Sequence, residues 1–319
     1  MYKKNHLWRR TPPAIFPVAL GFMGLAHAWR NAAEVLPVAT EIGDLLLGFA
    51  TAYFLFFAAS YVMKILARPT VVMDDLKASP ARAGVAAFPM AIMLLAAALL
   101  PVGIEARAVW WIGVITYYIA TGLVVWSILR DPPEARHLSP FQYLAFVGPI
   151  VGPIAGIPLG YVRESFWLAM AALVPYVVIT LGYYPRLLKV LPPPPLRPAL
   201  VIILAATSLF GLAFGMLGME WEFRLFYWLA EAMAVIILIV SPWLMEGGWT
   251  PTWGAFTFPA AAFTNLQYLG VTKGMGFVAE AGLIAGLTIA TPLVLYILWM
   301  SSKLWIRGDL AKMSGAATA

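Results

Sequence analysis

The sequence contains no cysteine and three histidines, and only 11% of its 319 residues are charged. Without cysteine, disulfide frameworks, thiolate metal sites and cysteine nucleophiles are excluded. Because His6, His27 and His137 leave little for a haem, zinc or di-iron site, we expect neither a metal nor a cofactor. A typical soluble domain has about a quarter of its residues charged. The shortage of charge therefore argues against a soluble fold.

Hydrophobic residues make up 62% of the chain, and a soluble fold of this length would have to expose much of that apolar surface. The composition therefore predicts an all-α polytopic membrane protein. A helix needs about 20 mostly apolar residues to cross the hydrocarbon core. Ten stretches meet this requirement: 13–29, 43–66, 84–103, 108–129, 141–161, 166–188, 198–217, 223–245, 250–271 and 279–303. A transmembrane barrel would instead need short, alternating segments.

Ten spans divide the chain into a cytoplasmic N-terminal segment (1–12), one transmembrane domain (13–303) and a short cytoplasmic tail (304–319). With the N-terminus inside, sixteen of the 21 Lys and Arg residues fall in cytoplasmic stretches. This bias is typical of cytoplasmic loops, so the net charge of +6 indicates topology rather than nucleic-acid binding. Each outer loop carries one basic residue, either an ordinary helix end or part of a ring that attracts anions: Arg30, Arg107, Arg163, Arg224 and Lys273.

The odd-numbered stretches share prolines and small residues that most even-numbered ones lack, which indicates a helix pair repeated five times. The prolines are Pro17, Pro89, Pro149, Pro153, Pro198 and Pro259, and the small residues include Gly21, Gly24, Gly152 and Gly211. Proline kinks a helix, and kinked helices in a bilayer lie inside the bundle or line a wet cavity. Small residues allow close packing or leave a passage. We therefore predict five hairpins, with odd helices inside and a broken helix at 141–161.

The odd stretches contain no Asp, Glu, Lys or Arg, and only His27 near an outer end. Proton- or cation-coupled carriers usually need an intramembrane carboxylate or histidine, and Glu231 on the eighth stretch is the clear candidate acid. An uncharged passage with basic mouths holds anions weakly, which suits conduction. A polar cluster in the ninth stretch is a candidate vestibule lining: Thr264, Asn265, Gln267 and Thr272. The sequence has no histidine box, intramembrane carboxylate pair or phosphate loop, so we do not expect an enzyme.

Four motifs carry a resemblance to a known family. They are Pro17 to Leu25 with Ala28-Trp29-Arg30, Ser139-Pro140 with Phe146 to Pro153, Leu196 to Leu200, and Trp253 to Pro259. In order and spacing, the chain resembles the tellurite-resistance/C4-dicarboxylate transporter family, which includes bacterial TehA proteins and the slow-type anion channels of plant guard cells. The resemblance covers nearly all of the chain.

This resemblance implies five hairpins in a quasi-fivefold array around a central pore, a homotrimer with one pore per protomer, and a bacterial inner-membrane location. It also implies anion permeation past a phenylalanine of the ninth stretch. The matching residue is Phe258, with Phe256 as the fallback, and two residues of separation point them to different faces. The expected function is a gated channel for small anions such as chloride or nitrate. The alternative is a secondary transporter or exporter of malate, succinate, sulfite or tellurite-related oxyanions.

Overall fold

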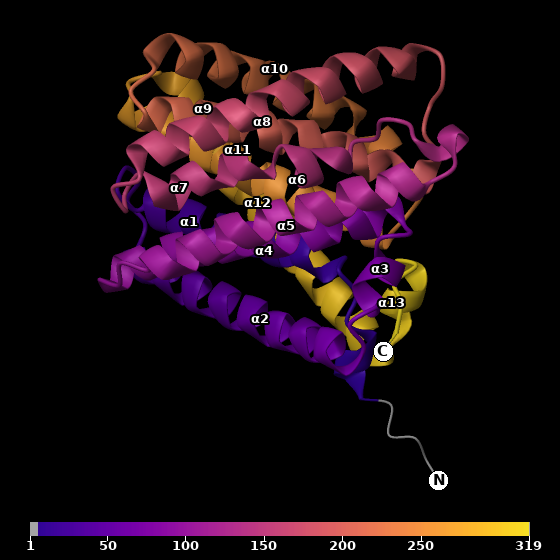
Figure 1. Cartoon of the computed structure of the whole chain (residues 1–319). Coiled ribbons are helices and arrows are strands. Elements are labelled where there is room, and N and C mark those ends of the chain that lie inside the picture. The colour runs from indigo at the N-terminus through magenta and orange to yellow at the C-terminus, as the bar shows by residue number, and fades with distance from the viewer. Residues whose placement is uncertain (1–5, 319) are drawn as a thin grey trace.

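The computed structural model describes residues 6–318, so the first five residues of the N-terminal segment lie outside the described residues. Apolar runs become helices because a helix satisfies its backbone hydrogen bonds internally, as a lipid environment requires. The described residues contain no strand (Figure 1). The α-helices are α1 (Ile15–Ala32), α2 (Thr40–Ala67), α3 (Val71–Asp75), α4 (Ser79–Leu99), α5 (Arg107–Arg130), α6 (Gln142–Phe146), α7 (Gly152–Gly156), α8 (Val162–Tyr183), α9 (Ile202–Met216), α10 (Glu220–Leu244), α11 (Gly254–Thr272), α12 (Phe277–Arg307) and α13 (Asp309–Met313).

Short 3₁₀ helices begin, end or interrupt several of these segments. They are η1 (Leu7–Arg10), η2 (Leu100–Val102), η3 (Pro133–Ala135), η4 (Gly148–Val151), η5 (Tyr184–Leu188), η6 (Pro194–Val201) and η7 (Pro251–Trp253). Each except η1 contains proline. Proline lacks the amide hydrogen that a longer α-helix would use at that position, so these turns mark where regular α-helix begins or stops.

Seven helical segments within the described residues are long and apolar enough to cross a membrane, which makes the chain a multi-pass membrane protein. They are Thr40–Ala67, Ser79–Val102, Arg107–Arg130, Val162–Leu188, Pro194–Met216, Glu220–Leu244 and Phe277–Arg307. Three of the ten expected stretches are not among them. Helices α1 and α11 have 18 and 19 residues and carry polar side chains, and the stretch from α6 to α7 is interrupted.

The interruption between α6 and α7 agrees with the broken helix that its prolines predict. Pro149 lies in the first turn of η4, and Pro153 lies in the first turn of α7. A broken helix leaves carbonyl groups without amide partners, and hydrocarbon offers none. Three side chains of α5 donate hydrogen bonds to these carbonyl oxygens: Trp110 to Gly152, Tyr117 to Leu144 and Thr121 to Ala145, each at 2.9 Å. Helix α5 therefore satisfies free carbonyl groups of the irregular segment and packs against the side of this segment that faces the lipid.

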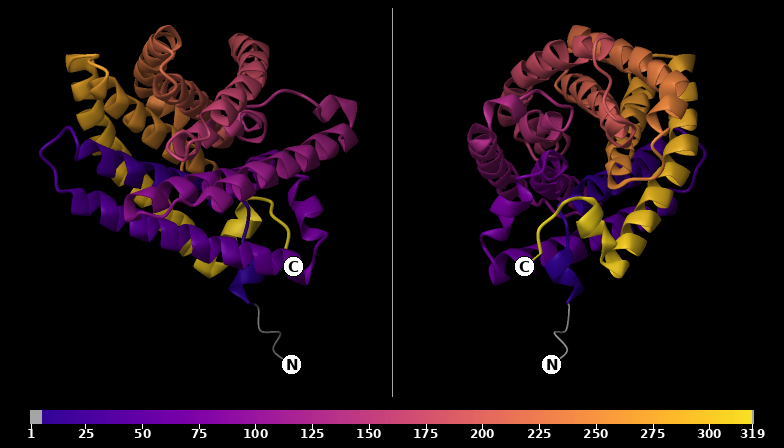
Figure 2. Two further views of the ribbon diagram at one scale, coloured as in Figure 1. Left: turned by 60° about the vertical axis from the view of Figure 1, so that its left-hand side comes forward. Right: turned by 90° about the vertical axis from the view of Figure 1, so that its right-hand side faces the viewer.

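Burial divides the long segments into two layers. In the most apolar window of Pro194–Met216, 94% of residues are buried, against 28–33% for α2, α5, α10 and α12. The right-hand view of Figure 2 shows long helices around the outline of the molecule with other segments inside them. Helices α1, α4, α9 and α11 thus form the interior with the α6–α7 segment, while α2, α5, α8, α10 and α12 each bury one stripe.

Two short helices that the sequence did not predict, α3 and α13, pack at the end of the molecule where the termini lie (Figure 1). A fully buried ion pair joins this region, with 3.0 Å between Lys64 Nζ and Asp75 Oδ2. Lys64 also donates to the Thr11 carbonyl oxygen at 3.1 Å, and the Ala317 amide donates to Asp75 Oδ1 at 2.8 Å. Burial raises the pKa of the Asp75 carboxyl, and the Lys64 ammonium opposes that rise. The pair therefore fixes the C-terminal tail beneath the helix bundle.

Candidate functional site

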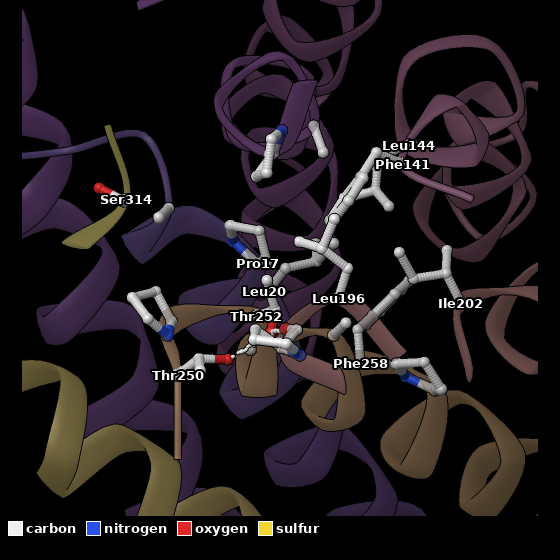
Figure 3. Close-up of a pocket in the computed structure, with 18 of the residues that line it drawn as sticks. Pro17, Leu20, Phe141, Leu144, Leu196, Ile202, Thr250, Thr252, Phe258 and Ser314 are labelled. Atoms are coloured by element: carbon white, nitrogen blue, oxygen red, sulfur yellow. Dashed lines mark hydrogen bonds between the residues drawn. The ribbon is translucent and has the colours of Figure 1, made fainter. Parts of the chain in front are cut away.

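An apolar cavity of about 310 Å³ opens at the end of the molecule that holds both termini; we call it the inner cavity. Its walls come from the beginnings of α1, α4, α6, α9 and α11 with the turns before them, and from the C-terminal tail. Figure 3 shows side chains from these segments facing one another across the space, with Ser314 of the tail opposite Phe258. The residues labelled there are Pro17, Leu20, Phe141, Leu144, Leu196, Ile202, Thr250, Thr252, Phe258 and Ser314.

A second cavity of about 560 Å³, the outer cavity, lies at the opposite end. It is lined by α1, α4 with η2, α7 and the residues after it, α9 and α11, so the same five stretches form both cavities. Its polar groups come from α1 and α11. Asn31 Nδ2 donates to Asn265 Oδ1 at 3.0 Å, and Asn265 Nδ2 donates to the Gly24 carbonyl oxygen at 2.9 Å. This chain of amides holds the outer halves of the two helices together beside the cavity.

Phe258 of α11 lies between the two cavities. Among the described residues, it alone lines both of them, and its side chain also borders a small hollow of about 20 Å³ beside α4 and α9. The residue is 7% exposed. Its neighbour Pro259 lies inside the helix and lines the inner cavity. An apolar ring thus stands at the point where the two spaces approach each other.

Two glycines of α1 determine how closely Phe258 can approach this helix. A Cβ atom on Gly24 would lie 3.5 Å from Cδ2 and Cε2 of the Phe258 ring. A Cβ atom on Gly21 would lie 2.7 Å from the Phe258 backbone nitrogen, closer than real Cβ contacts. Glycine is therefore required for α1 and α11 to lie this near one another.

Phe256, the fallback residue for the same role, points elsewhere. It lines neither the inner nor the outer cavity. It packs instead in a separate apolar cluster with Val18, Leu200, Leu244 and Ile297. Two residues along a helix turn the side chain by about 200°, so the two phenylalanines lie on opposite faces of α11.

The other prolines and glycines singled out in the sequence divide between cavity walls and helix contacts. Pro17 and Pro259 line the inner cavity, and Gly24 lines the outer one. The remaining members line neither cavity: Pro89, Pro149, Pro153, Pro198, Gly21, Gly152 and Gly211. Four further prolines line a cavity although the sequence reasoning did not single them out: Pro80, Pro195 and Pro251 at the inner end and Pro101 at the outer end. Pro158, one of the three prolines that predicted the broken helix, lines the outer cavity as well. Each of the four lies close to one end of an apolar stretch, which was the available signal.

Of the five basic residues expected at the outer mouth, only Arg30 lines the outer cavity among the described residues. Four of the five form ion pairs: Arg30 with Asp44, Arg107 with Glu105, Arg163 with Glu164, and Lys273 with Glu220. The stretches at this end also hold eight acidic residues, which the sequence reasoning did not weigh: Glu34, Glu41, Asp44, Glu105, Glu164, Glu220, Glu222 and Glu280. Arg224 has no ion pair within residues 6–318, and it too lies outside the cavity.

The two residues considered for proton coupling occupy different surroundings. Glu231 accepts a hydrogen bond from the Gln267 amide, and Gln267 accepts one from the Tyr227 hydroxyl at 2.8 Å. None of these three lines either cavity. His27 does line the outer cavity, and its Nε2 atom is buried without a hydrogen-bond partner among the described residues.

Only one member of the predicted vestibule cluster, Asn265, lines the outer cavity. Thr264, Gln267 and Thr272 do not. Thr264 and Gln267 are fully buried and face α12, where Gly286 and Gly282 leave room for them. The part of the chain that the structure describes holds no group of three or more His, Asp or Glu side chains that could bind a metal ion.

Apolar helices in two layers, with cavities entering the inner layer from both ends, define a multi-pass helical membrane protein with space for small solutes. The chain belongs to the SLAC1 family of voltage-dependent anion channels, whose sequence model matches residues 10–302. This match covers nearly the whole chain, confirms the predicted family and indicates a function in anion transport. No curated protein matches the chain.

Proposed function

We propose that this protein is a gated channel for small anions and that its passage runs from the inner cavity to the outer cavity past Phe258. The observation that carries the proposal is that Phe258 lines both cavities. With the phenyl ring between them, the two spaces form a closed state, and displacement of the ring would open a continuous path.

The architecture we propose for this channel has ten membrane-crossing segments, arranged as five hairpins in a quasi-fivefold array. The same five stretches line both cavities, as expected if they surround one axis. Helices α1 and α11 and the broken segment are shorter or more polar than an isolated span, and other helices shield them from lipid. Irregular or polar backbone is tolerated at membrane depth when protein encloses it.

The proposed orientation places both termini in the cytoplasm of a bacterial cell, and the proposed assembly is a homotrimer. Within residues 6–318, fourteen basic residues but only six acidic ones belong to the stretches at the end of the molecule that holds the termini. Excess Lys and Arg is typical of the cytoplasmic side. The same excess gives the inner mouth a positive potential, which raises the local concentration of anions. We therefore propose that the basic residues at the inner end, rather than those at the outer end, attract anions to the passage.

Conduction through such a passage depends on weak binding. The inner cavity is almost wholly apolar, and its five stretches bring no charged side chain to the level of Phe258. An anion that enters must give up water near the ring, which is costly, and nothing there holds it tightly once it has passed. Weak sites favour rapid exit and so favour a channel over a tight-binding carrier.

A proton-linked carrier for dicarboxylates or oxyanions remains the second candidate, and one observation favours it. His27 lines the outer cavity and offers a buried Nε2 atom without a partner among the described residues. Protonation of this atom would create positive charge beside the passage. Glu231 is a weaker candidate, because its hydrogen-bond partner Gln267 also lies away from both cavities.

Anion efflux from proteoliposomes tests the proposal and separates the two functions. Purified wild type, Phe258→Ala, Glu231→Gln and His27→Ala proteins are compared with chloride, nitrate or malate inside the vesicles. A channel predicts non-saturating chloride and nitrate efflux that increases in Phe258→Ala and ignores a pH gradient. Saturable malate efflux that requires a pH gradient and is lost in His27→Ala would establish the carrier instead.

A further inference from the structure

We propose that a groove between α10 and α12 binds one acyl chain of an anionic phospholipid. This lateral groove has a volume of about 290 Å³ and is almost entirely apolar. Helix α11 forms its floor through Phe256, Ala260 and Phe263, while Leu238 of α10 and Ile289 of α12 stand at its edges. It is separate from the inner and outer cavities, with which it shares no residue.

The groove exists because small side chains lie where two outer helices would otherwise meet. Ala234 of α10 and the neighbouring pair Ala285 and Gly286 of α12 all line it. Helix α10 packs mainly on α9, and α12 packs mainly on α11. The groove between α10 and α12 is therefore open to a molecule other than this chain.

The surroundings of the groove select an apolar occupant. Leu238 and Ile289 at its edges are 55% and 45% exposed, on helices that are apolar and long enough to cross the membrane. A groove that opens on that surface faces hydrocarbon rather than water. Water cannot occupy it favourably, because it offers almost no polar partners. A lipid chain fills it at no desolvation cost and gains dispersion contacts with its walls.

Basic and aromatic side chains at one end of the groove supply a headgroup site. Along α12, Leu293 lines the groove, and exposed Tyr296 and Trp299 follow it toward the termini end. Lys303 comes next, with its Nζ atom 4.6 Å from the Trp299 ring centroid. Lys303 forms no ion pair with any described residue. Interfacial aromatic residues with a free lysine are typical of contact with anionic headgroups.

The length of the helix fits this assignment. Ten residues separate Leu293 from Lys303, which is about 15 Å along a helix. The hydrocarbon of one leaflet is also about 15 Å thick, half of a bilayer core. A phospholipid with its phosphate beside Lys303 would therefore place the end of one chain in the groove near Leu293.

The lipid would also lie against the helix that carries Phe258. Phe256 and Ala260 of the groove floor flank Phe258 in sequence, but they face away from the inner cavity. Binding of the lipid goes beyond the proposed channel activity and does not depend on it. A failure to conduct anions would leave this proposal standing.

Native mass spectrometry of protein released from vesicles of phosphatidylglycerol and phosphatidylcholine tests the proposal. We expect wild type to retain one more phospholipid per protomer than Leu293→Trp, whose larger side chain fills the groove where the chain end is placed. The matched control is Leu295→Trp, an exposed leucine of α12 that does not line the groove, and it should retain the wild-type number. Lys303→Gln should keep the lipid but lose several-fold in its preference for phosphatidylglycerol.

Equal lipid retention in wild type and Leu293→Trp would overturn the proposal. So would a change in the oligomeric mass of Leu293→Trp with unchanged lipid, because the groove would then be a contact between copies of the chain. An unchanged preference in Lys303→Gln would overturn the headgroup assignment.

A second measurement needs no variant and covers the case in which Leu293→Trp does not fold. Wild type is photolysed in vesicles containing phosphatidylglycerol with a diazirine at the chain end. Adducts on Ile289, Leu293 or Phe256 support the proposal, and adducts only on other surfaces overturn it.

Discussion

Replacing Phe258 with alanine should convert a closed protein into a conducting one. The inner and outer cavities measure about 310 and 560 Å³, and the phenyl ring of Phe258 contributes to the walls of both. Truncation at Cβ removes that ring while leaving the α11 backbone and Pro259 in place. The expected result is one continuous passage.

The size of the effect follows from the barrier that the ring imposes. An anion beside an apolar ring in a narrow site loses water without gaining a partner, which costs several kcal/mol even for polar groups and more for ions. If the ring accounts for about 2.7 kcal/mol of that barrier, its removal raises current about 100-fold, since each 1.36 kcal/mol is tenfold in rate. We therefore expect an increase of about a hundredfold in single-protein current across a planar bilayer.

Phe256→Ala is the matched control, because it makes the same chemical change two residues earlier on the same helix. Its ring packs with Val18 and Leu244 and lines neither the inner nor the outer cavity. Truncating a buried phenylalanine costs about 3–5 kcal/mol of stability, so a general loosening of the fold would affect both variants. Equal currents in the two variants, or wild-type current in folded Phe258→Ala, would refute the reasoning.

Three further predictions concern helix contacts, the tail and the buried ion pair. Gly21→Ala should lower the thermal unfolding temperature and alter anion flux, because the added Cβ would lie 2.7 Å from the Phe258 backbone nitrogen of α11. The control Gly48→Ala should leave both quantities unchanged, because a Cβ there would have no atom within 4 Å. Deleting residues 309–319 removes Met313 and Ser314 from the wall of the inner cavity, so it should raise the current of Phe258→Ala further and leave wild type without current. Asp75→Asn should cost about 3–5 kcal/mol in denaturant unfolding by leaving Lys64 buried without a counter-ion; pairing it with Lys64→Met should restore most of that loss. An unchanged current in Phe258→Ala after the deletion would contradict the prediction about the tail. An Asp75→Asn variant as stable as wild type would contradict the prediction about the buried ion pair.

Much of the helical framework could be read from the sequence, because a membrane imposes simple rules on the backbone. Long apolar runs must become helices, and the expected stretch 108–129 corresponds to α5 (Arg107–Arg130). Three closely spaced prolines, Pro149, Pro153 and Pro158, predicted the interruption between α6 and α7, because proline lacks the amide hydrogen that a continuous helix needs. Helices α3 and α13 escaped prediction because each has only five residues, too few for a periodic signal.

The sequence narrowed the residue between the two cavities to two phenylalanines of α11 but did not choose between them. The pattern of residues along α11 left Phe258 and Phe256 as alternatives, and only packing against Gly24 of α1 distinguishes the ring that lies between the cavities. The outer basic residues illustrate the opposite case. The count of Lys and Arg on each side predicted the orientation of the chain in the membrane. The count did not include neighbouring acidic residues such as Asp44, which forms an ion pair with Arg30. Ion pairs between separate helices depend on the three-dimensional arrangement, which one sequence does not encode in any local pattern.

The reversal potential of Phe258→Ala current in a tenfold potassium chloride gradient tests the central claim most directly. For a pore that passes only anions, the reversal potential should approach the chloride equilibrium value, about 59 mV for a tenfold ratio of a monovalent ion. Reversal near the potassium equilibrium potential, or near zero, would contradict an anion-selective passage through these cavities.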